Sequence, residues 1–303
     1  MERAMTHQPK QAAGFMVISM LVIGLIDNYI AVIARDVSLW QFQFMRTCMG
    51  LPLLMLVAYF GFGTLRPKRL WAVLLRNGFV ALGMVFYFGS LAFMPIAQAL
   101  AGLFTAPIFV LLISIFVFGE KVGALRIFAV LFGFVGIIVV LGPSETGLSW
   151  LNFVPLFGGL FYAMGSVATR KICVDESTIV MLAGIFGIQG VFGIFMLFML
   201  AIIAPEAPAG SDGFLLRGFV WPEKLTWWLV LVQAVGSLIG VGFLIRAYQS
   251  AEPSFVAVFE YSIFIFGPLF AYLLFGQSVT LNQLIGIVMI AGAGSLIALR
   301  SQN

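Results

Sequence analysis

Four charged side chains within apolar stretches are the residues of this chain most able to do chemistry: Asp27, Arg46, Arg76 and Glu260. If those stretches cross a membrane, each charge costs roughly 2.5–3.5 kcal/mol on insertion scales, so such residues are seldom accidental. Counting about 1.5 Å per residue from the ends of the stretches places Asp27 and Arg46 at a similar depth from one face, and Arg76 and Glu260 at a similar depth from the other. We therefore expect each couple to form either a static ion pair or part of a solute-binding site.

Glu260 carries the strongest functional signal of the four. It lies between Phe259 and Tyr261 in an otherwise apolar run. A carboxyl group among apolar side chains favours its protonated form, so Glu260 could bind a proton or a cationic solute. The alternative is a static salt bridge with Arg76. We predict that replacement of Glu260 by glutamine abolishes function while leaving folding and membrane insertion intact.

Uncharged polar side chains in the same stretches could orient a solute by hydrogen bonds. Their alternative role is bonding between helices, which is worth on the order of 0.6–2 kcal/mol for each bond. These residues are Asn28, Gln98, Thr105, Gln189, Gln233 and Ser237. Three tyrosines could form walls for a flat, partly apolar solute, because each combines an aromatic face with a hydroxyl. They are Tyr87, Tyr162 and Tyr261.

The sequence contains no pattern typical of a metal site or of nucleotide hydrolysis. The only histidine is His7, and no spacing of histidine, cysteine and acidic residues resembles a set of metal ligands. There is no GxxxxGK[ST] phosphate loop, which argues against a primary pump. We therefore expect no metal, no cofactor and no catalytic residue.

The composition is that of an integral membrane protein. Hydrophobic residues make up 62% of the chain and charged residues 9%, against roughly 25% charged in an average soluble domain. In such a protein the net charge of +4 reports topology through the bias of Lys and Arg to the cytoplasmic side. It does not indicate binding to nucleic acid.

Ten stretches are long enough, or nearly so, to cross a bilayer as helices, which needs about 20 mostly apolar residues. We therefore predict an all-α integral membrane protein with ten transmembrane helices. The predicted spans are Ala12–Ile33, Leu39–Gly61, Leu70–Ala92, Pro95–Phe118, Ala124–Leu141, Ser149–Thr169, Thr178–Ala204, Leu225–Ala247, Pro253–Phe275 and Thr280–Arg300. The longest loop, Pro205 to Lys224, is expected to be a solvent linker over one mouth.

The distribution of Lys and Arg orients these spans. If the N-terminus is cytoplasmic, twelve of these residues fall on the inside, three on the outside, and Arg46 lies within a helix. This asymmetry predicts that both termini face the cytoplasm. We expect the protein to lie in the cytoplasmic (inner) membrane as a multi-pass protein.

A pattern near the end of the first half of the chain returns near its C-terminus. Two apolar runs flank a corner at Phe118-Gly119-Glu120, and the same arrangement surrounds Phe275-Gly276-Gln277. This recurrence predicts an internal duplication, with a tail at 1–11 and two five-helix repeats at 12–141 and 149–300. Because five is odd, the repeats enter the membrane in opposite senses. Inverted repeats are typical of alternating-access transporters, which place the solute between the repeats.

One of these corners, together with residues elsewhere in the first half, carries a resemblance to a known family. These residues are Pro107 with the downstream corner Phe118-Gly119-Glu120, Gly133 and Gly136 in the following helix, and Arg46 early in the second helix. With ten predicted helices, the whole chain resembles the EamA-type members of the drug/metabolite transporter superfamily. The second half departs from the family pattern, because Gln277 stands where an acidic residue is usual.

The resemblance implies a basket of ten helices around a central cavity between the halves, and transport of small organic solutes. It leaves the solute open among amino acids, S-adenosylmethionine, riboflavin and drug-like cations. The stretch from Pro95 to Val117 looks most similar to members that move S-adenosylmethionine or riboflavin. Helix nine should line the cavity if the family fold holds, which would place Glu260 there.

We accordingly expect a secondary transporter that works by alternating access, with proton coupling and direction left open. One alternative is a non-transporting membrane assembly subunit, in which the polar helix residues mediate protein contacts. A membrane-embedded lipid-modifying enzyme would need clustered histidines or acids at a membrane face, so we do not expect an enzyme. The expected partners are a small organic solute and membrane lipid, with the protein a monomer or homodimer.

Overall fold

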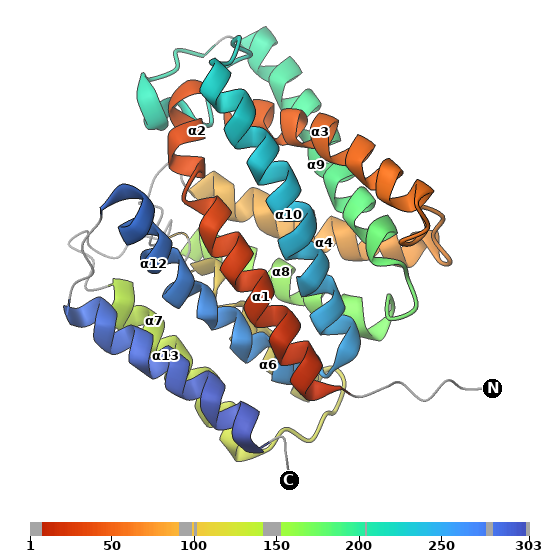
Figure 1. Cartoon of the computed structure of the whole chain (residues 1–303), viewed down its shortest axis with the longest axis vertical. Coiled ribbons are helices and arrows are strands. Elements are labelled where there is room, and N and C mark those ends of the chain that lie inside the picture. Colours follow the sequence, from red (N-terminus) through yellow and green to blue (C-terminus); the bar gives the residue numbers. More distant parts are fainter. Residues whose placement is uncertain are drawn as a thin grey trace.

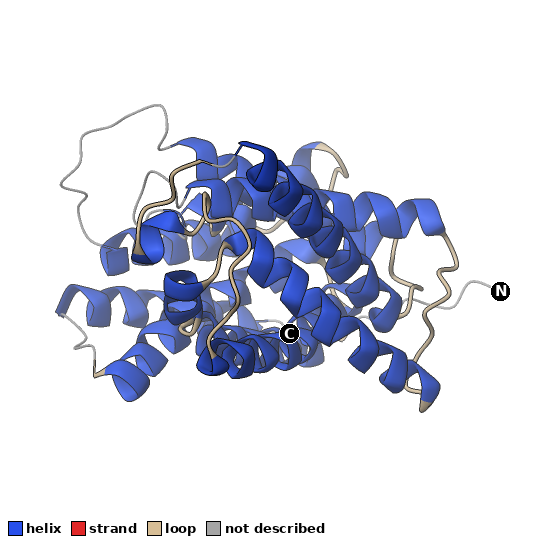
Figure 2. Ribbon diagram, turned by 90° about the horizontal axis from the view of Figure 1, so that it is seen from above, coloured by secondary structure: helices blue, strands red, loops and turns tan. Residues whose placement is uncertain are grey.

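The computed structural model describes residues 8–90, 99, 102–141, 153–203, 205–276 and 281–300, and all regular structure in these ranges is helical (Figures 1 and 2). The prediction of an all-α protein is thereby confirmed. The main helices are α1 (Pro9–Asp27), α2 (Ile30–Asp36), α3 (Leu39–Tyr59), α4 (Leu70–Ser90), α6 (Ala106–Phe116), α7 (Ala124–Leu141), α8 (Val154–Lys171), α9 (Thr178–Ile203), α10 (Lys224–Ser250), α11 (Pro253–Val256), α12 (Ile263–Phe275) and α13 (Leu281–Arg300).

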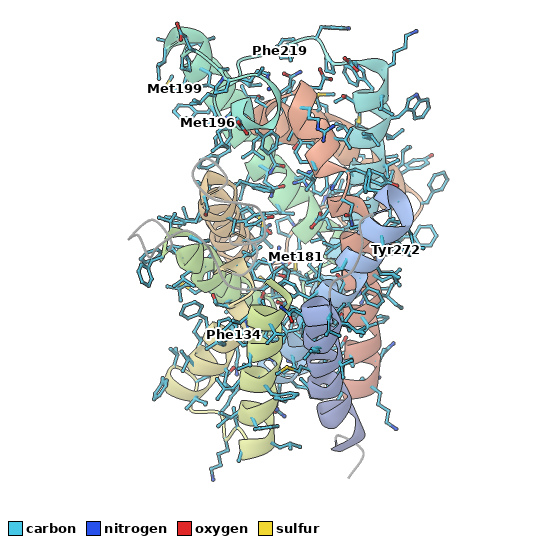
Figure 3. The ribbon with its side chains drawn as sticks, turned by 90° about the vertical axis from the view of Figure 1, so that its left-hand side faces the viewer. Phe134, Met181, Met196, Met199, Phe219 and Tyr272 are labelled. Atoms are coloured by element: carbon cyan, nitrogen blue, oxygen red, sulfur yellow. The ribbon has the colours of Figure 1, made fainter. Side chains whose placement is uncertain are left out.

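Six helical stretches in the described ranges are long and apolar enough to cross a membrane. Shorter apolar helices lie at Ala106–Phe116, Ala124–Val139 and Leu284–Ala293. Large apolar side chains are exposed along the long sides of the bundle, as Tyr272 on α12 illustrates in Figure 3. An apolar exterior of this kind is what lipid-facing helices require. Each of the ten predicted spans overlaps a helix, while the number of membrane crossings stays a prediction.

Two predicted spans are interrupted. The first extends from Pro9 to Asp36, beyond the predicted Ala12–Ile33, and a turn at Asn28 and Tyr29 separates α1 from α2. The ninth was predicted as one helix over Pro253–Phe275, but a 3₁₀ segment, η3 (Ala257–Ser262), stands between α11 and α12. Because 3₁₀ stretches within helices often mark strained or functional positions, the location of Glu260 in η3 is informative.

The helices pack mainly as four long pairs, visible in Figure 1: α1 with α10, α4 with α8, α3 with α9, and α7 with α13. Glycines permit these close approaches. A Cβ added at Gly83 of α4 would lie 2.9 Å from the carbonyl oxygen of Gly158 in α8, and one at Gly136 of α7 would lie 3.0 Å from that of Gly286 in α13. Small residues at helix contacts are the usual means of close packing in membranes.

The basic loops of the chain meet at one end of the bundle. Glu176 accepts hydrogen bonds from the backbone N–H groups of Lys68 at 2.9 Å and Arg69 at 2.6 Å. Gln249 donates its side-chain amide to the carbonyl oxygens of Cys173 and Glu176 at 2.9 and 3.0 Å. The loops that follow α3 and α8 and the last turn of α10 are therefore fastened together at this end, which we call the basic end.

The segment 205–223 lies at the opposite end, at the top of Figure 1. It was expected to be a solvent linker, but its Phe214 is buried. The N–H of Leu39 donates to the Phe214 carbonyl at 2.8 Å, and the indole N–H of Trp40 donates to the Leu215 carbonyl at 2.9 Å. The segment therefore packs over the start of α3.

Candidate functional site

Some of the residues predicted to bind a solute lie in two separate groups, each of which also contains one residue that was not predicted. The first, which we call the Arg46 cluster, consists of Asp27, Gln43, Arg46, Gln189, Gln233 and Ser237 from α1, α3, α9 and α10. The second, the Glu260 cluster, consists of Tyr162, Tyr248, Glu260 and Tyr261 from α8, α10 and η3. The Arg46 cluster takes side chains from both predicted halves of the chain, whereas the four residues of the Glu260 cluster all belong to the second half, 149–300.

The guanidinium group of Arg46 is held by neutral partners. Its Nη2 donates to Oε1 of Gln43 at 2.6 Å and to Oε1 of Gln189, and its Nη1 makes a long contact of 3.5 Å with Oγ of Ser237. The rings of Phe42 and Phe186 each lie 5.2 Å from the guanidinium carbon. Such cation–π contacts stabilise an arginine that is removed from water. The Nε atom is buried without a hydrogen-bond partner.

Asp27 does not neutralise Arg46 directly. Among the described side chains, the ion pairs within 4.0 Å are Arg126–Glu252 and Lys171–Glu120, so the direct pairing of Asp27 with Arg46 considered from the sequence is absent here. The end of α1 adjoins the cluster through Gln233, which donates to the carbonyl oxygen of Ile26 at 2.8 Å and accepts from Ser237 at 3.2 Å. The guanidinium group bonds instead to the side-chain amides of Gln43 in α3 and Gln189 in α9. A comparison of depths along the helices could not predict these partners.

A small pocket adjoins the Arg46 cluster between α3, α4 and α9. Its walls are largely apolar, and Gln43 and Gln189 provide its polar part. The other lining residues are Leu39, Trp40, Ala81, Met84, Val85, Phe88 and Phe192. Arg46 thus fixes the orientation of two amides that face this pocket.

Glu260 is fully buried and is held from one side only. Its Oε1 accepts hydrogen bonds from the hydroxyls of Tyr248 at 2.5 Å and Tyr162 at 3.3 Å. Its Oε2 and the hydroxyl of Tyr261 are both buried without a hydrogen-bond partner in the described structure. An unsatisfied buried polar atom costs about 1–3 kcal/mol, so native proteins seldom keep one without a reason. The cluster therefore has unused capacity to bind a polar group.

Arg76 is also buried, but it bonds to neighbours other than Glu260. Its Nε donates to Oγ1 of Thr169 at 2.9 Å and its Nη1 to Oδ1 of Asn77 at 2.7 Å. The static pair of Arg76 with Glu260 considered from the sequence is therefore not formed in this structure. Arg76 instead joins α4 to α8.

The remaining predicted residues lie outside the two clusters. Asn28 donates to the carbonyl oxygens of Gly24 at 2.7 Å and Gly267 at 3.3 Å, which fastens the α1–α2 turn to α12. Thr105 donates to the Gly102 carbonyl at 2.6 Å. The ring of Tyr87 is buried beside that of Phe88, with centroids 4.8 Å apart. These contacts fit the structural alternative to solute binding. Gln98 lies outside the described residues.

Sequence reasoning missed two members of the clusters. Tyr248 was overlooked because the eighth span was ended at Ala247, whereas α10 continues to Ser250. Gln43 was overlooked although it lies three residues before Arg46, a spacing that brings helical side chains together. A search for polar partners at helical spacing from each buried charge would have found Gln43.

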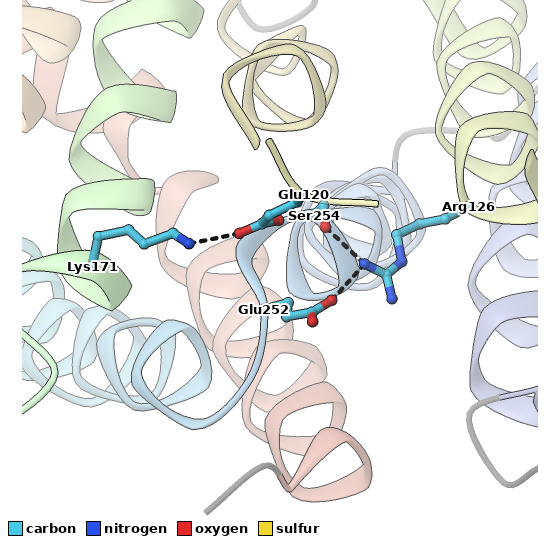
Figure 4. Close-up of polar contacts among 5 residues, drawn as sticks. All are labelled: Glu120, Arg126, Lys171, Glu252 and Ser254. Carbon is cyan, nitrogen blue, oxygen red and sulfur yellow. Dashed lines mark hydrogen bonds and ion pairs between the residues drawn. The ribbon is translucent and has the colours of Figure 1, made fainter. Parts of the chain in front are cut away.

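Two ion pairs join the predicted halves at the basic end (Figure 4). Arg126 donates to Glu252 at 2.7 Å and to the hydroxyl of Ser254 at 2.8 Å, and Lys171 lies 2.8 Å from Glu120. Glu120 belongs to the repeated corner that suggested the duplication. All four charged side chains are partly exposed, so each pair contributes little to stability, about 0–1 kcal/mol.

Comparisons with a family profile and with individual proteins each match most of this chain. The sequence profile of the EamA-like transporter family matches residues 10–142 and again residues 149–299. A riboflavin transporter of Rhizobium johnstonii is 27% identical over 269 residues, which cover 89% of this chain and 82% of that protein. An S-adenosylmethionine uptake transporter of Rickettsia bellii is 24% identical over 258 residues, covering 85% of this chain and 81% of that protein.

One solved crystal structure of a protein aligns with 97% of this chain and 97% of its own length, with a TM-score of 0.75 at 17% identity, which is a likeness of fold alone. The relatives are transporters and not enzymes, as the sequence predicts. The family resemblance seen in the sequence is confirmed. The chain belongs to the EamA-like transporter family.

Proposed function

We propose that this protein is a secondary transporter that moves a small organic metabolite across the cytoplasmic membrane by alternating access. Its two five-helix repeats, 12–141 and 149–300, would be related by a two-fold axis in the membrane plane. The solute would bind between them, and a proton on Glu260 would couple to its movement. Both termini would face the cytoplasm, because the basic loops meet at the end where α1 begins and α13 ends (Figure 1).

The packing of the helices supports the two-fold relation. Exchange of the halves would pair α1 with α8, α3 with α9, α4 with α10, α6 with α12 and α7 with α13. Under that exchange the α1–α10 contact becomes the α8–α4 contact, and the α12–α1 contact becomes the α6–α8 contact. The α3–α9 and α7–α13 pairs map onto themselves. The twofold match of the family profile is further support.

Glu260 is the observation that carries the proposed mechanism. It is a fully buried acid in a break between helices, with two tyrosine hydroxyls on Oε1 and no partner on Oε2. A carboxyl in this setting can exchange a proton for a polar or cationic solute group, because either one satisfies the free oxygen. Because Glu260 lies in the 3₁₀ segment η3, the proposed exchange would occur where a change of helical pitch could accompany it.

The ion pairs at the basic end fit one step of this cycle. Lys171–Glu120 and Arg126–Glu252 both connect the two proposed repeats. They would hold the cytoplasmic side closed in the conformation described and would have to separate when that side opens. Their partial exposure makes them weak enough to break reversibly.

The solute class follows from the relatives. Riboflavin and S-adenosylmethionine, which the relatives are named for, are both small organic metabolites with an aromatic ring system. We propose a solute of this general class for the present chain, with amino acids and drug-like cations included in the test. Inverted repeats allow transport in either direction, so the geometry does not select import or export.

A thermal-shift screen of the purified protein in detergent tests the proposal. The panel holds amino acids, riboflavin, S-adenosylmethionine, nucleosides and cationic drugs, and each compound that stabilises the protein is tested again on Glu260→Gln. We expect saturable stabilisation by one class, with loss of the effect in the variant. Glu206→Gln is the matched control, because Glu206 is an exposed acid in the loop at the other end. Absence of saturable stabilisation by every class would favour an assembly subunit over a transporter.

A further inference from the structure

Arg46 is a cation without a counter-ion in contact. Its bonded partners Gln43, Gln189 and Ser237 are neutral, and no acidic side chain of the described residues lies within 4.0 Å of it. Arg46 is partly buried, and charged residues in membrane helices usually pair with another charge or with a polar group. The described side chains therefore supply no contacting anion for the charge of Arg46.

The guanidinium group is held in a fixed orientation. The rings of Phe42 and Phe186 each lie 5.2 Å from its central carbon, and both are almost fully buried. Two amide oxygens hold Nη2, while Nε has no partner and Nη1 makes only the 3.5 Å contact with Ser237. Donor capacity therefore remains on a group that cannot turn freely. A planar, pre-oriented guanidinium is well suited to bind an oxyanion.

The charge balance around Arg46 favours a single negative charge. One arginine matches one carboxylate, whereas a phosphate monoester carries a charge close to −2. Asp27 adjoins the cluster through Gln233, whose side-chain amide donates to the carbonyl oxygen of the neighbouring Ile26 at 2.8 Å and accepts from Ser237 at 3.2 Å. Asp27 forms no ion pair with Arg46 within 4.0 Å. It would repel a dianion and attract a cation. The head group of an α-amino acid carries one charge of each sign and matches this arrangement.

We propose that the Arg46 cluster binds the zwitterionic head group of the transported solute, with the carboxylate on Arg46 and the ammonium group facing Asp27. The solute is then an α-amino acid or a larger metabolite that ends in one. This inference rests on the proposed transport function and narrows it. It separates the substrates named for the two relatives, because S-adenosylmethionine has such a head group and riboflavin has none.

Matched ligands test the proposal. Binding to the purified protein is measured by calorimetry for the α-amino acids and S-adenosylmethionine, and each compound that binds is compared with its decarboxylated amine. We expect removal of the carboxylate to weaken binding at least about tenfold, as loss of a hydrogen bond to a charged group does. An amine that binds as tightly as its parent would overturn the assignment to Arg46.

Variants of Arg46 test whether the preference for a carboxylate-bearing ligand arises from this residue. In Arg46→Gln the preference for the carboxylate should disappear, and in Arg46→Lys part of it should remain because the charge stays while the planar donor group is lost. Arg35→Gln is the control, since Arg35 is an exposed arginine of α2 outside the cluster. A carboxylate preference that survives unchanged in Arg46→Gln contradicts the proposal. If that variant does not fold, Arg46→Lys and the ligand pairs on the wild-type protein still decide the question.

The outcomes also separate this inference from the proposed function. Binding and Glu260-dependent transport of riboflavin or of a cation without a carboxylate would refute the head-group site and leave the transporter standing. Failure of every compound to bind and to be transported would contradict both.

Discussion

The Arg46 and Glu260 clusters hold their ionisable side chains by different kinds of contact. Glu260 is fully buried and Arg46 is partly buried, and neither forms an ion pair with a described side chain. Arg46 lies in the regular helix α3 and is held by two amides and two aromatic faces. Glu260 lies in the 3₁₀ segment η3 and is held on a single oxygen by two hydroxyls.

The difference suggests a division of labour. The partners of Arg46 fix its plane, so it suits a role as an anchor for a solute. The hydroxyls around Glu260 can serve either protonation state, because a hydroxyl donates to a carboxylate or accepts from a carboxylic acid. Glu260 therefore suits a group that gains and loses a proton during transport.

Among substitutions of residues that neighbour the two ionisable groups, the largest effect is expected from giving Arg46 an internal anion. In Gln189→Glu the new carboxylate should occupy the guanidinium and compete with the solute. We predict at least about a tenfold loss of binding for a carboxylate-bearing solute and little change for its decarboxylated amine. Calorimetry with the two ligands measures both values. Gln189→Met is the control of similar size that adds no charge, and an equal loss in both variants would show that the new charge is not the cause.

A smaller effect is expected from removing one hydroxyl beside Glu260. Tyr248→Phe eliminates the 2.5 Å hydrogen bond and Tyr162→Phe the longer one of 3.3 Å. Because a bond to a charged group is worth about 1.5–3 kcal/mol, we predict about a tenfold fall in transport rate for Tyr248→Phe and a lesser fall for Tyr162→Phe. Initial rates of uptake in proteoliposomes measure this order. The reverse order would mean that Tyr162 is the principal partner of Glu260.

The smallest effect is expected from breaking a partly exposed ion pair at the basic end, and the labelling rate of the Cys173 thiol measures it. Burial raises the pKa of the Cys173 thiol to about 11. In a Cys48→Ser background, maleimide labelling of Cys173 at pH 7 should therefore be slow and rise about tenfold per pH unit, since only the thiolate reacts. Lys171→Gln removes one ion pair of the basic end and should speed labelling a few-fold, because a partly exposed pair is worth at most about 1 kcal/mol. An unchanged rate would mean that this pair does not hold the end closed.

The sequence predicted the class of the fold and its family well, because both depend on long apolar stretches and on a repeated corner. It did not predict the contacts of the buried charges. Pairing Asp27 with Arg46, and Arg76 with Glu260, assumed that equal depth means contact. The depth of a residue along a helix does not show which face of the helix its side chain occupies. In the structure, Arg46 and Arg76 bond to neutral side chains of other helices and not to the acids at equal depth.

The 3₁₀ geometry of η3 could not be predicted from the sequence either. The run around Glu260 is apolar on all sides, so no periodicity in it distinguishes a 3₁₀ segment from an α-helix. Tyr248 lay one residue beyond a predicted span end, and boundaries are the least certain part of such predictions. Glu260 itself was found because an acid in an apolar run is conspicuous. Its partners required the structure.

Proton-driven uptake in proteoliposomes tests the central claim most directly. The solute identified by screening is supplied outside, a proton gradient is imposed, and accumulation is followed for wild type, Glu260→Gln and Glu206→Gln. The account predicts gradient-dependent accumulation in the wild type and in Glu206→Gln, and none in Glu260→Gln although that variant keeps the wild-type melting temperature. Wild-type flux in Glu260→Gln would remove Glu260 from the mechanism and contradict the account.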